Sequence, residues 1–130
     1  MDSARWGVGT VSGITVTALD DVEAIPLPNG SWSRMLITDK RSTGNRSSLG
    51  YSVFTAKTEL QPVAHETEEV AYVVAGAGEL RLDDEIVQFQ RGDALLIPPR
   101  VWHAVVNTGD EDVVMVFGFP HPDYPPTERR

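Results

Sequence analysis

Short apolar runs dominate the hydrophobic pattern of the chain, and residues that favour turns separate them. The runs are rich in β-branched side chains and recur at intervals of about ten residues, with Gly, Pro, Asn or Asp between them. No segment keeps apolar side chains at helical spacing over several turns. The pattern therefore predicts strands over Ile14–Leu19, Arg34–Thr38, Tyr51–Ala56, Glu69–Val74, Glu79–Leu82, Ile86–Phe89, Ala94–Ile97, His103–Asn107 and Val113–Phe119.

Many short strands with turns between them are typical of an antiparallel sandwich or barrel, and a length of 130 residues predicts a single domain. We expect residues 1–30 to form an N-terminal arm with one possible strand and residues 31–119 to form the barrel. Residues 120–130 form a Pro-rich tail. Because proline removes the backbone donor, we expect this tail to run over the surface without ladder hydrogen bonds.

Charge and composition exclude several classes of function. The chain has 11 Lys+Arg against 19 Asp+Glu, a formal net charge of −8, which argues against binding to nucleic acid or to an anionic membrane. It contains no Cys, which excludes disulfides, thiolate zinc sites and thiol nucleophiles. No apolar stretch is long enough for a membrane span and no secretory signal is evident, so we expect a soluble cytoplasmic protein.

Any metal must therefore be held by carboxylates and by the three histidines. His65 and Glu69 are four residues apart, so in an extended strand both side chains point to one face, together with Ala71 and Val73. A carboxylate among such neighbours is costly unless it is paired or bound to metal.

A second segment places His103 in an apolar row with Val101 and Val105. If the two segments lie side by side, His65, Glu69 and His103 converge. Two imidazoles and one carboxylate with open positions are the ligand set of non-haem Fe(II) oxygenases, and they also suit Zn, Mn, Ni or Co acting as Lewis acids.

Each histidine also has a plainer interpretation. His65 and Glu69 could form a weak surface pair, and His103 could be a core imidazole satisfied by a backbone carbonyl. His121, between two prolines, is expected to be a solvent-exposed residue of the tail; the sharper alternative is a proton carrier folded over the barrel mouth.

At these positions the chain resembles the cupin superfamily, a group of small jelly-roll barrels. The second cupin motif, G-x5-P-x-G-x2-H-x3-N, and the first, G-x5-H-x-H-x3-E-x6-G, match at seven positions. These are His65, Glu69, Gly76, Gly92, Pro98, His103 and Asn107.

Three positions depart from the motifs. Lys57 and Arg100 stand where glycines are usual, and Val63 stands where the first ligand histidine is usual. The resemblance thus implies a jelly-roll β-barrel with three of the four usual metal ligands, His65, Glu69 and His103. Gln61 lies one strand repeat from Val63 and is not expected to replace the missing ligand.

The resemblance implies a divalent-metal-dependent enzyme that acts on a small organic metabolite. The reaction would be a dioxygenation with Fe(II), or an isomerisation, cyclisation or lysis by Lewis-acid chemistry with Zn, Mn, Ni, Co or Fe. The alternative is a non-catalytic barrel that binds a small ligand and has lost full metal coordination. Homodimerisation is also implied, with the arm from Trp6 to Leu19 as a candidate for strand exchange and with Tyr72 and Trp102 on a partner surface.

Overall fold

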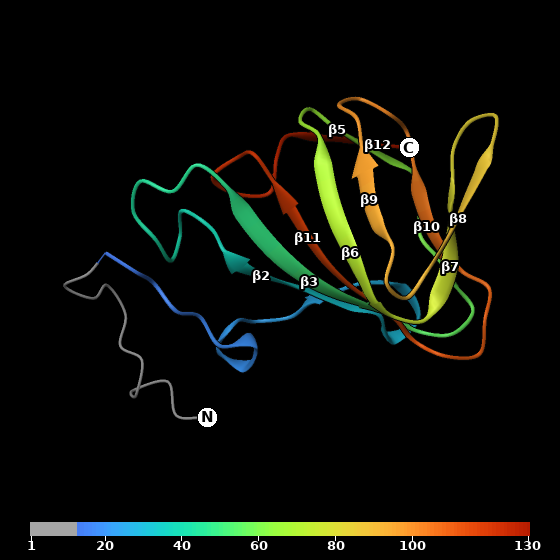
Figure 1. Cartoon of the computed structure of the whole chain (residues 1–130), viewed down its shortest axis with the longest axis horizontal. Helices are drawn as coiled ribbons and strands as arrows, with labels where there is room; N and C mark the ends of the chain where they lie inside the picture. Colours follow the sequence, from blue (N-terminus) through green and yellow to red (C-terminus); the bar gives the residue numbers. More distant parts are fainter. Residues whose placement is uncertain (1–12) are drawn as a thin grey trace.

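The computed structural model describes residues 13–130, and most of its regular structure is strand (Figure 1). Short 3-10 turns occupy η2 (Leu19–Asp21) and η3 (Pro28–Gly30). None of the helices among the described residues is long and apolar enough to cross a membrane. The strands are β1 (Ile25–Pro26), β2 (Trp32–Ile37), β3 (Ser48–Phe54), β4 (Thr58–Glu59), β5 (Val63–His65), β6 (Glu69–Ala75), β7 (Ala77–Arg81), β8 (Ile86–Gln90), β9 (Ala94–Ile97), β10 (Ala104–Asn107), β11 (Val113–Phe119) and β12 (Thr127–Arg129).

Antiparallel pairing arranges these strands in three sheets. A six-stranded sheet has the order β1-β2-β3-β11-β6-β9, a four-stranded sheet has the order β4-β10-β7-β8, and β12 pairs with β5. Figure 1 shows the small β5–β12 sheet beside the ends of β6 and β9. The predicted all-β jelly roll is confirmed, although in residues 13–130 no continuous ladder closes the sheets into a barrel.

Alternation along β6 separates an inner face from an outer face. Ala71 and Val73 are buried, whereas the side chains between them, Val70, Tyr72 and Val74, are exposed. Successive side chains of a strand point to opposite faces, so one face of β6 packs on the interior and the other faces away from it. Glu69 shares the inner face with Ala71 and Val73.

The core lies between the two larger sheets and consists of apolar side chains from their inner faces. It contains Phe54, Ala71, Val73, Leu80, Phe89, Ile97, Val113, Met115, Phe117 and Phe119, and Val101 and Val105 pack against it. Burying a Val, Leu, Ile, Phe or Met side chain contributes about 1.5–3 kcal/mol relative to leaving it exposed. This packing is what holds the flanking polar residues of the inner face in place.

Two expectations about the ends of the chain were wrong. The strand expected at Ile14–Leu19 does not form; instead η2 begins at Leu19, and the strand of the N-terminal region is β1, which pairs with β2. The tail does make ladder hydrogen bonds, because Thr127–Arg129 follow the last proline and have free backbone N–H groups. Every other expected strand overlaps an observed one. The part of the Trp6–Leu19 arm before residue 13 lies outside the described residues.

Candidate metal centre

Three short backbone segments bring the predicted side chains together. His65 is the last residue of β5 and Glu69 is the first residue of β6. His103 precedes β10 and forms an isolated bridge with Val63, through a Val63 N–H bond to the His103 carbonyl at 2.9 Å and its reciprocal at 3.0 Å. Because this bridge lies two residues from His65, it sets the two imidazole rings side by side.

The two imidazoles face one carboxylate oxygen. Nε2 of His65 lies 3.1 Å from Oε1 of Glu69, and Nε2 of His103 lies 3.6 Å from the same oxygen. One donor atom from each residue lies within 4.8 Å of the others. All three side chains are shielded from solvent, with 5%, 14% and 5% of the His65, Glu69 and His103 side chains exposed.

Hydrogen-bond partners assign the proton on each ring. Nδ1 of His103 lies 2.8 Å from the Val101 carbonyl oxygen, which only accepts, so this nitrogen carries a hydrogen. Nδ1 of His65 lies 2.7 Å from the Thr127 hydroxyl, whose own hydrogen is donated to the Pro125 carbonyl at 2.8 Å. In this orientation the hydroxyl oxygen accepts from His65 Nδ1–H. Both Nε2 atoms are left facing Glu69, where they can coordinate a cation.

The site perturbs the pKa values of its own groups. Burial alone would raise the pKa of the Glu69 carboxyl, but hydrogen bonds and charges from His103 and His65 outweigh burial and hold that pKa below its ordinary 4.5. Burial alone would lower the pKa of His103, but hydrogen bonds with Glu69 and the Val101 carbonyl, together with the Glu69 charge, raise it above 6.5. The cluster therefore favours an ionised Glu69 carboxylate beside a protonated His103.

The three residues form one wall of a cavity of about 500 Å³. The rest of its lining is mostly apolar: Ile25, Leu27, Pro28, Met35, Phe54, Leu60, Val63, Val105, Met115, Phe117, Phe119 and Tyr124. The Phe119 and Tyr124 rings meet the His65 ring edge-on, with centroids 5.0 and 5.3 Å away. The volume and lining are those of a small-molecule site with a few polar groups.

A few further polar side chains line this cavity. Ser33 and Ser52 share a hydrogen bond of 2.6 Å between their hydroxyls on the wall formed by β2 and β3. Gln61 and Arg129 also line it, and both are exposed. Val63, at the position where a fourth ligand is usual, contributes an apolar side chain instead.

The sequence interpretation missed the contribution of the tail. Tyr124, Thr127 and Arg129 all contact the site or line the cavity, and burial raises the pKa of the Tyr124 hydroxyl above its ordinary 10.0. Four prolines in this region hid a strand of only three residues. The signal available was the Thr-Glu-Arg run after the last proline, which is too short to establish a period of two.

The other residues singled out from the sequence lie elsewhere. His121 is half-buried, hydrogen-bonds with the Asp123 backbone, and does not line the cavity. Asn107 is 1% exposed, and its amide donates to the carbonyls of Phe54, Thr55 and Glu111. This motif residue therefore connects neighbouring backbone segments by hydrogen bonds and is not part of the site.

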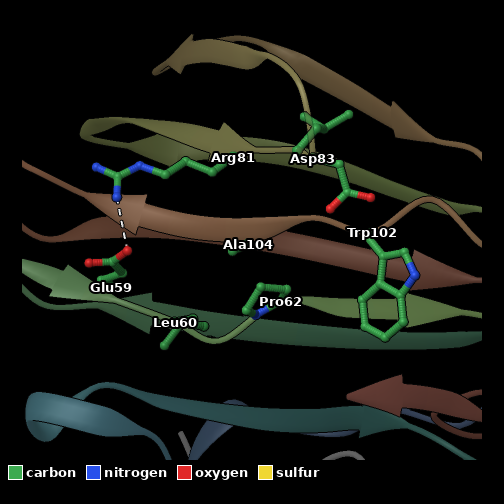
Figure 2. Close-up of a pocket in the computed structure, with 8 residues that line it drawn as sticks. Glu59, Leu60, Pro62, Arg81, Asp83, Trp102 and Ala104 are labelled. Carbon is green, nitrogen blue, oxygen red and sulfur yellow. Dashed lines mark hydrogen bonds and ion pairs between the residues drawn. The ribbon is translucent and has the colours of Figure 1, made fainter. Parts of the chain in front are cut away.

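A second, smaller hollow of about 150 Å³ lies on the other face of β10. It includes Ala104, whose neighbour Val105 lines the large cavity, so the two hollows lie on opposite sides of the strand. Figure 2 shows Glu59 and Arg81 joined across it by an ion pair of 2.9 Å, with Trp102 at one end. Its charged side chains are already paired, Glu59 with Arg81 and Asp83 with Arg130, which leaves the large cavity as the candidate site.

Comparisons with known proteins agree with this architecture. Protein SchB of Streptomyces halstedii is 34% identical over 116 residues, covering 83% of this chain and 81% of the relative. The polyketide cyclase RemF of Streptomyces resistomycificus superposes with a TM-score of 0.75 at 23% identity, covering 89% of this chain and 84% of RemF.

The oxalate decarboxylase of Lactobacillus farciminis superposes with a TM-score of 0.74 at 20% identity, over 85% of this chain and 34% of that enzyme. The family model of the cupin domain matches residues 51–119, a range that holds His65, Glu69 and His103 as well as the strands that carry the core. The chain belongs to the cupin superfamily.

Proposed function

We propose that the chain is a divalent-metal-dependent enzyme that converts a small, largely apolar organic molecule in the large cavity. The observation that carries the proposal is the commitment of both Nδ1 atoms to other partners, which leaves both Nε2 atoms aimed at one buried carboxylate. An imidazole that coordinates a metal ordinarily donates its other N–H in this way.

The donor set fits a divalent metal ion. His65, Glu69 and His103 would hold it, and two imidazoles with one carboxylate suit Fe(II), Zn, Mn, Ni or Co. A bound ion would supply Lewis acidity toward a carbonyl or enol oxygen, or a site for O2 in the case of Fe(II). Val63 leaves the ligand set one short of four, so more positions would be open to water or substrate.

The chain's own residues would bind and orient the substrate. The apolar walls of the cavity, about 500 Å³ in volume, would hold its carbon framework and exclude water. The hydroxyls of Ser33 and Ser52 and the guanidinium of Arg129 are polar groups that would fix the orientation of its oxygens. Apolar walls with a few polar groups predict a substrate that is mainly apolar and carries several oxygen substituents.

Between the two reaction classes, Lewis-acid chemistry is favoured over oxygenation. The structural neighbours named above are a polyketide cyclase and an oxalate decarboxylase, and neither name denotes an oxygenase. Cyclisation of a polyketide-like substrate is the reaction we put first, because RemF aligns over most of its length and the cavity is apolar. Dioxygenation stays the second candidate.

Non-catalytic ligand binding is the alternative class. The observation that favours it is Val63, since an apolar side chain at a usual ligand position is also what a barrel that has lost its metal would carry. In that case the Glu69 carboxylate would be held by its contacts with the two imidazole rings and by the raised pKa of His103.

Elemental analysis of protein purified without chelator tests the proposal. We expect near-stoichiometric divalent metal in the parent and its loss in His65→Ala, Glu69→Ala and His103→Ala. His121→Ala is the matched control, because His121 lies outside the cavity, and it should keep the metal. A parent that takes up no metal even after reconstitution with Fe(II), Mn(II) or Zn(II) would overturn the enzyme proposal and favour the binding module.

A further inference from the structure

The tail lies directly against one member of the candidate metal centre. In the β12–β5 ladder, Thr127 is the cross-strand partner of His65. Side chains of directly opposed residues project from the same face of a sheet, so the Thr127 hydroxyl stands beside the His65 ring. The two atoms that meet are Thr127 Oγ1 and His65 Nδ1, at 2.7 Å.

The Thr127 hydroxyl is arranged to accept a hydrogen bond from His65. Its single hydrogen is donated to the carbonyl of Pro125 at 2.8 Å, and a carbonyl cannot donate in return. With its hydrogen on the Pro125 carbonyl, the hydroxyl turns its lone pairs toward His65 Nδ1 and favours the tautomer that carries a proton on this nitrogen. With Nδ1 protonated and tied to the tail, the ring has one orientation and presents Nε2 toward Glu69 at 3.1 Å.

We propose that Thr127 is a positioning residue of the metal centre: its hydroxyl fixes the tautomer and the orientation of His65. This inference rests on the proposed function, since it assigns a task toward the metal that His65, Glu69 and His103 would bind. It extends the site beyond the segment that carries the ligands, because Thr127 lies 62 residues from His65 in the sequence.

The two histidines are supported in different ways. His103 donates its Nδ1–H to the carbonyl of Val101, a backbone group two residues away that no side-chain substitution removes. His65 depends on a side-chain hydroxyl from another strand. The inference therefore predicts an asymmetry, in which one substitution in the tail disturbs His65 and leaves the His103 support intact.

Thr127→Val removes the hydroxyl but leaves strand β12 able to form. Valine has the shape and the β-branching of threonine, so the backbone ladder of β12 with β5 can persist while the acceptor is lost. Thr127→Ser is the conservative variant that keeps the acceptor. Glu128→Ala is the matched control, because Glu128 is exposed and projects from the opposite face of the same strand.

Two measurements test the inference. The first is the nitrogen NMR spectrum of the His65 ring in metal-free protein at alkaline pH, assigned by comparison with His65→Ala. We expect a proton on Nδ1 in the parent, in Thr127→Ser and in Glu128→Ala, and loss of this preference in Thr127→Val. The second is the affinity for Zn(II) and Co(II), measured by competition with a chelator. Thr127→Val should weaken it about 10- to 100-fold, as loss of such an outer partner does, whereas Thr127→Ser and Glu128→Ala keep the parent affinity.

Specific outcomes overturn the inference. It is wrong if Thr127→Val keeps both the ring spectrum and the metal affinity of the parent, or if Glu128→Ala weakens the affinity as much as Thr127→Val does. If the parent binds neither metal, the proposed function fails, and the ring spectrum alone then decides: a His65 that is not protonated on Nδ1, or that is indifferent to Thr127→Val, refutes the positioning role.

Discussion

The carboxylate of Glu69 is 14% exposed and faces two imidazole rings, and the stability that it contributes depends on pH. Glu69 has its pKa held below 4.5 by His103 and His65, so its ionised form stabilises the fold above that pH, and this contribution is lost as the pH falls through the lowered value. His103 has its pKa raised above 6.5, so its contribution is complete below pH 6.5 and is lost as the pH rises through the raised value.

The metal-free protein should therefore be most stable between the ordinary pKa values of Glu69 and His103, 4.5 and 6.5. We expect its free energy of unfolding, measured with urea across a pH series, to fall as the pH rises above this window. Glu69→Gln should flatten that fall, because the neutral amide no longer attracts a proton to His103. Metal affinity should change in the opposite sense and increase with pH, since protons compete with the ion for the same nitrogens. A parent whose stability rises steadily from the window into the alkaline range would contradict this balance.

At the scale of single residues, the chemistry of the side chains was a better guide than their spacing. The structure does place His65, Glu69 and His103 on the wall of one cavity. The expectation that His65 and Glu69 share one face of one extended strand was wrong, because His65 ends β5 and Glu69 begins β6, which belong to different sheets. Thr127 could not be found in the same way, because its role depends on a pairing between segments 62 residues apart. Nothing in the local pattern around Thr127 specifies that partner.

Lys57 and Arg100, which stand where the motifs have glycine, show another limit of prediction from sequence. Lys57 and Arg100 have φ values of 60° and 62°, so the backbone keeps a left-handed conformation without glycine. A non-glycine residue in this region costs roughly 1–2 kcal/mol. Both turns therefore have the left-handed backbone that glycine favours, and residue identity alone could not reveal this.

Among the elements, the turn between β6 and β7 is fixed by Gly76. Its φ is +82°, and a Cβ at this position would collide with the Asp112 carbonyl oxygen and lie 2.9 Å from Val113 Cα. The turn therefore packs its backbone directly on the start of β11. Gly92, between β8 and β9, has a similar φ of +93° but no atom within 4 Å of such a Cβ.

Comparing these two glycines distinguishes the cost of backbone strain, which both share, from the cost of a steric collision, which only Gly76 would incur. We expect Gly92→Ala to lower the free energy of unfolding by about 1 kcal/mol, the cost of a side chain at positive φ. Gly76→Ala should cost several times more, because the backbone of residues 112 and 113 must also move. Urea denaturation of the two variants checks the order. Equal losses would show that the contact with Asp112 and Val113 carries no cost.

The elements that the sequence predicted well are those with residues enough to show a pattern. Ala94–Ile97 and Val113–Phe119 have the predicted bounds, whereas β1, β4, β5 and β12 have two or three residues each and gave no period to detect. The run Ile14–Leu19 failed for another reason. It has strand composition, but its last residue, Leu19, begins η2, and the Leu19 carbonyl accepts from the Arg34 guanidinium.

On the scale of the whole molecule, the outer face of the six-stranded sheet has an apolar patch. Val70, Tyr72, Val74 and Leu96 are 49%, 51%, 42% and 64% exposed, and Val70 lies directly opposite Leu96 in the β6–β9 ladder. Neighbouring apolar side chains on one sheet face suit a protein interface. Trp102 is not part of this patch: it lines the small hollow beside the four-stranded sheet, where the Arg130 guanidinium lies over its ring at 4.1 Å.

The expected homodimer stays a prediction, and we place its interface on this patch. Two copies with a net charge of −8 each repel one another, and the exposed apolar side chains of the patch give them a surface on which to meet. We expect sedimentation analysis to show a dimer for the parent and a monomer for Leu96→Glu. Ile86→Glu is the matched control: Ile86 is 57% exposed but lies on β8 in the other sheet, so the dimer should persist. A monomeric parent, or a dimer unaffected by Leu96→Glu, removes the prediction.

The pairing of β12 with β5 has a consequence for the kinetics of folding. It joins residues 62 positions apart, and chains dominated by such distant contacts fold in milliseconds to seconds, roughly a thousand times more slowly than helical bundles. The loop between them must close before the Thr127 hydroxyl meets His65, and the entropy of that closure opposes early contact. We therefore expect the metal ion to bind late on the refolding pathway. It would stabilise a chain that is already folded and would not initiate folding.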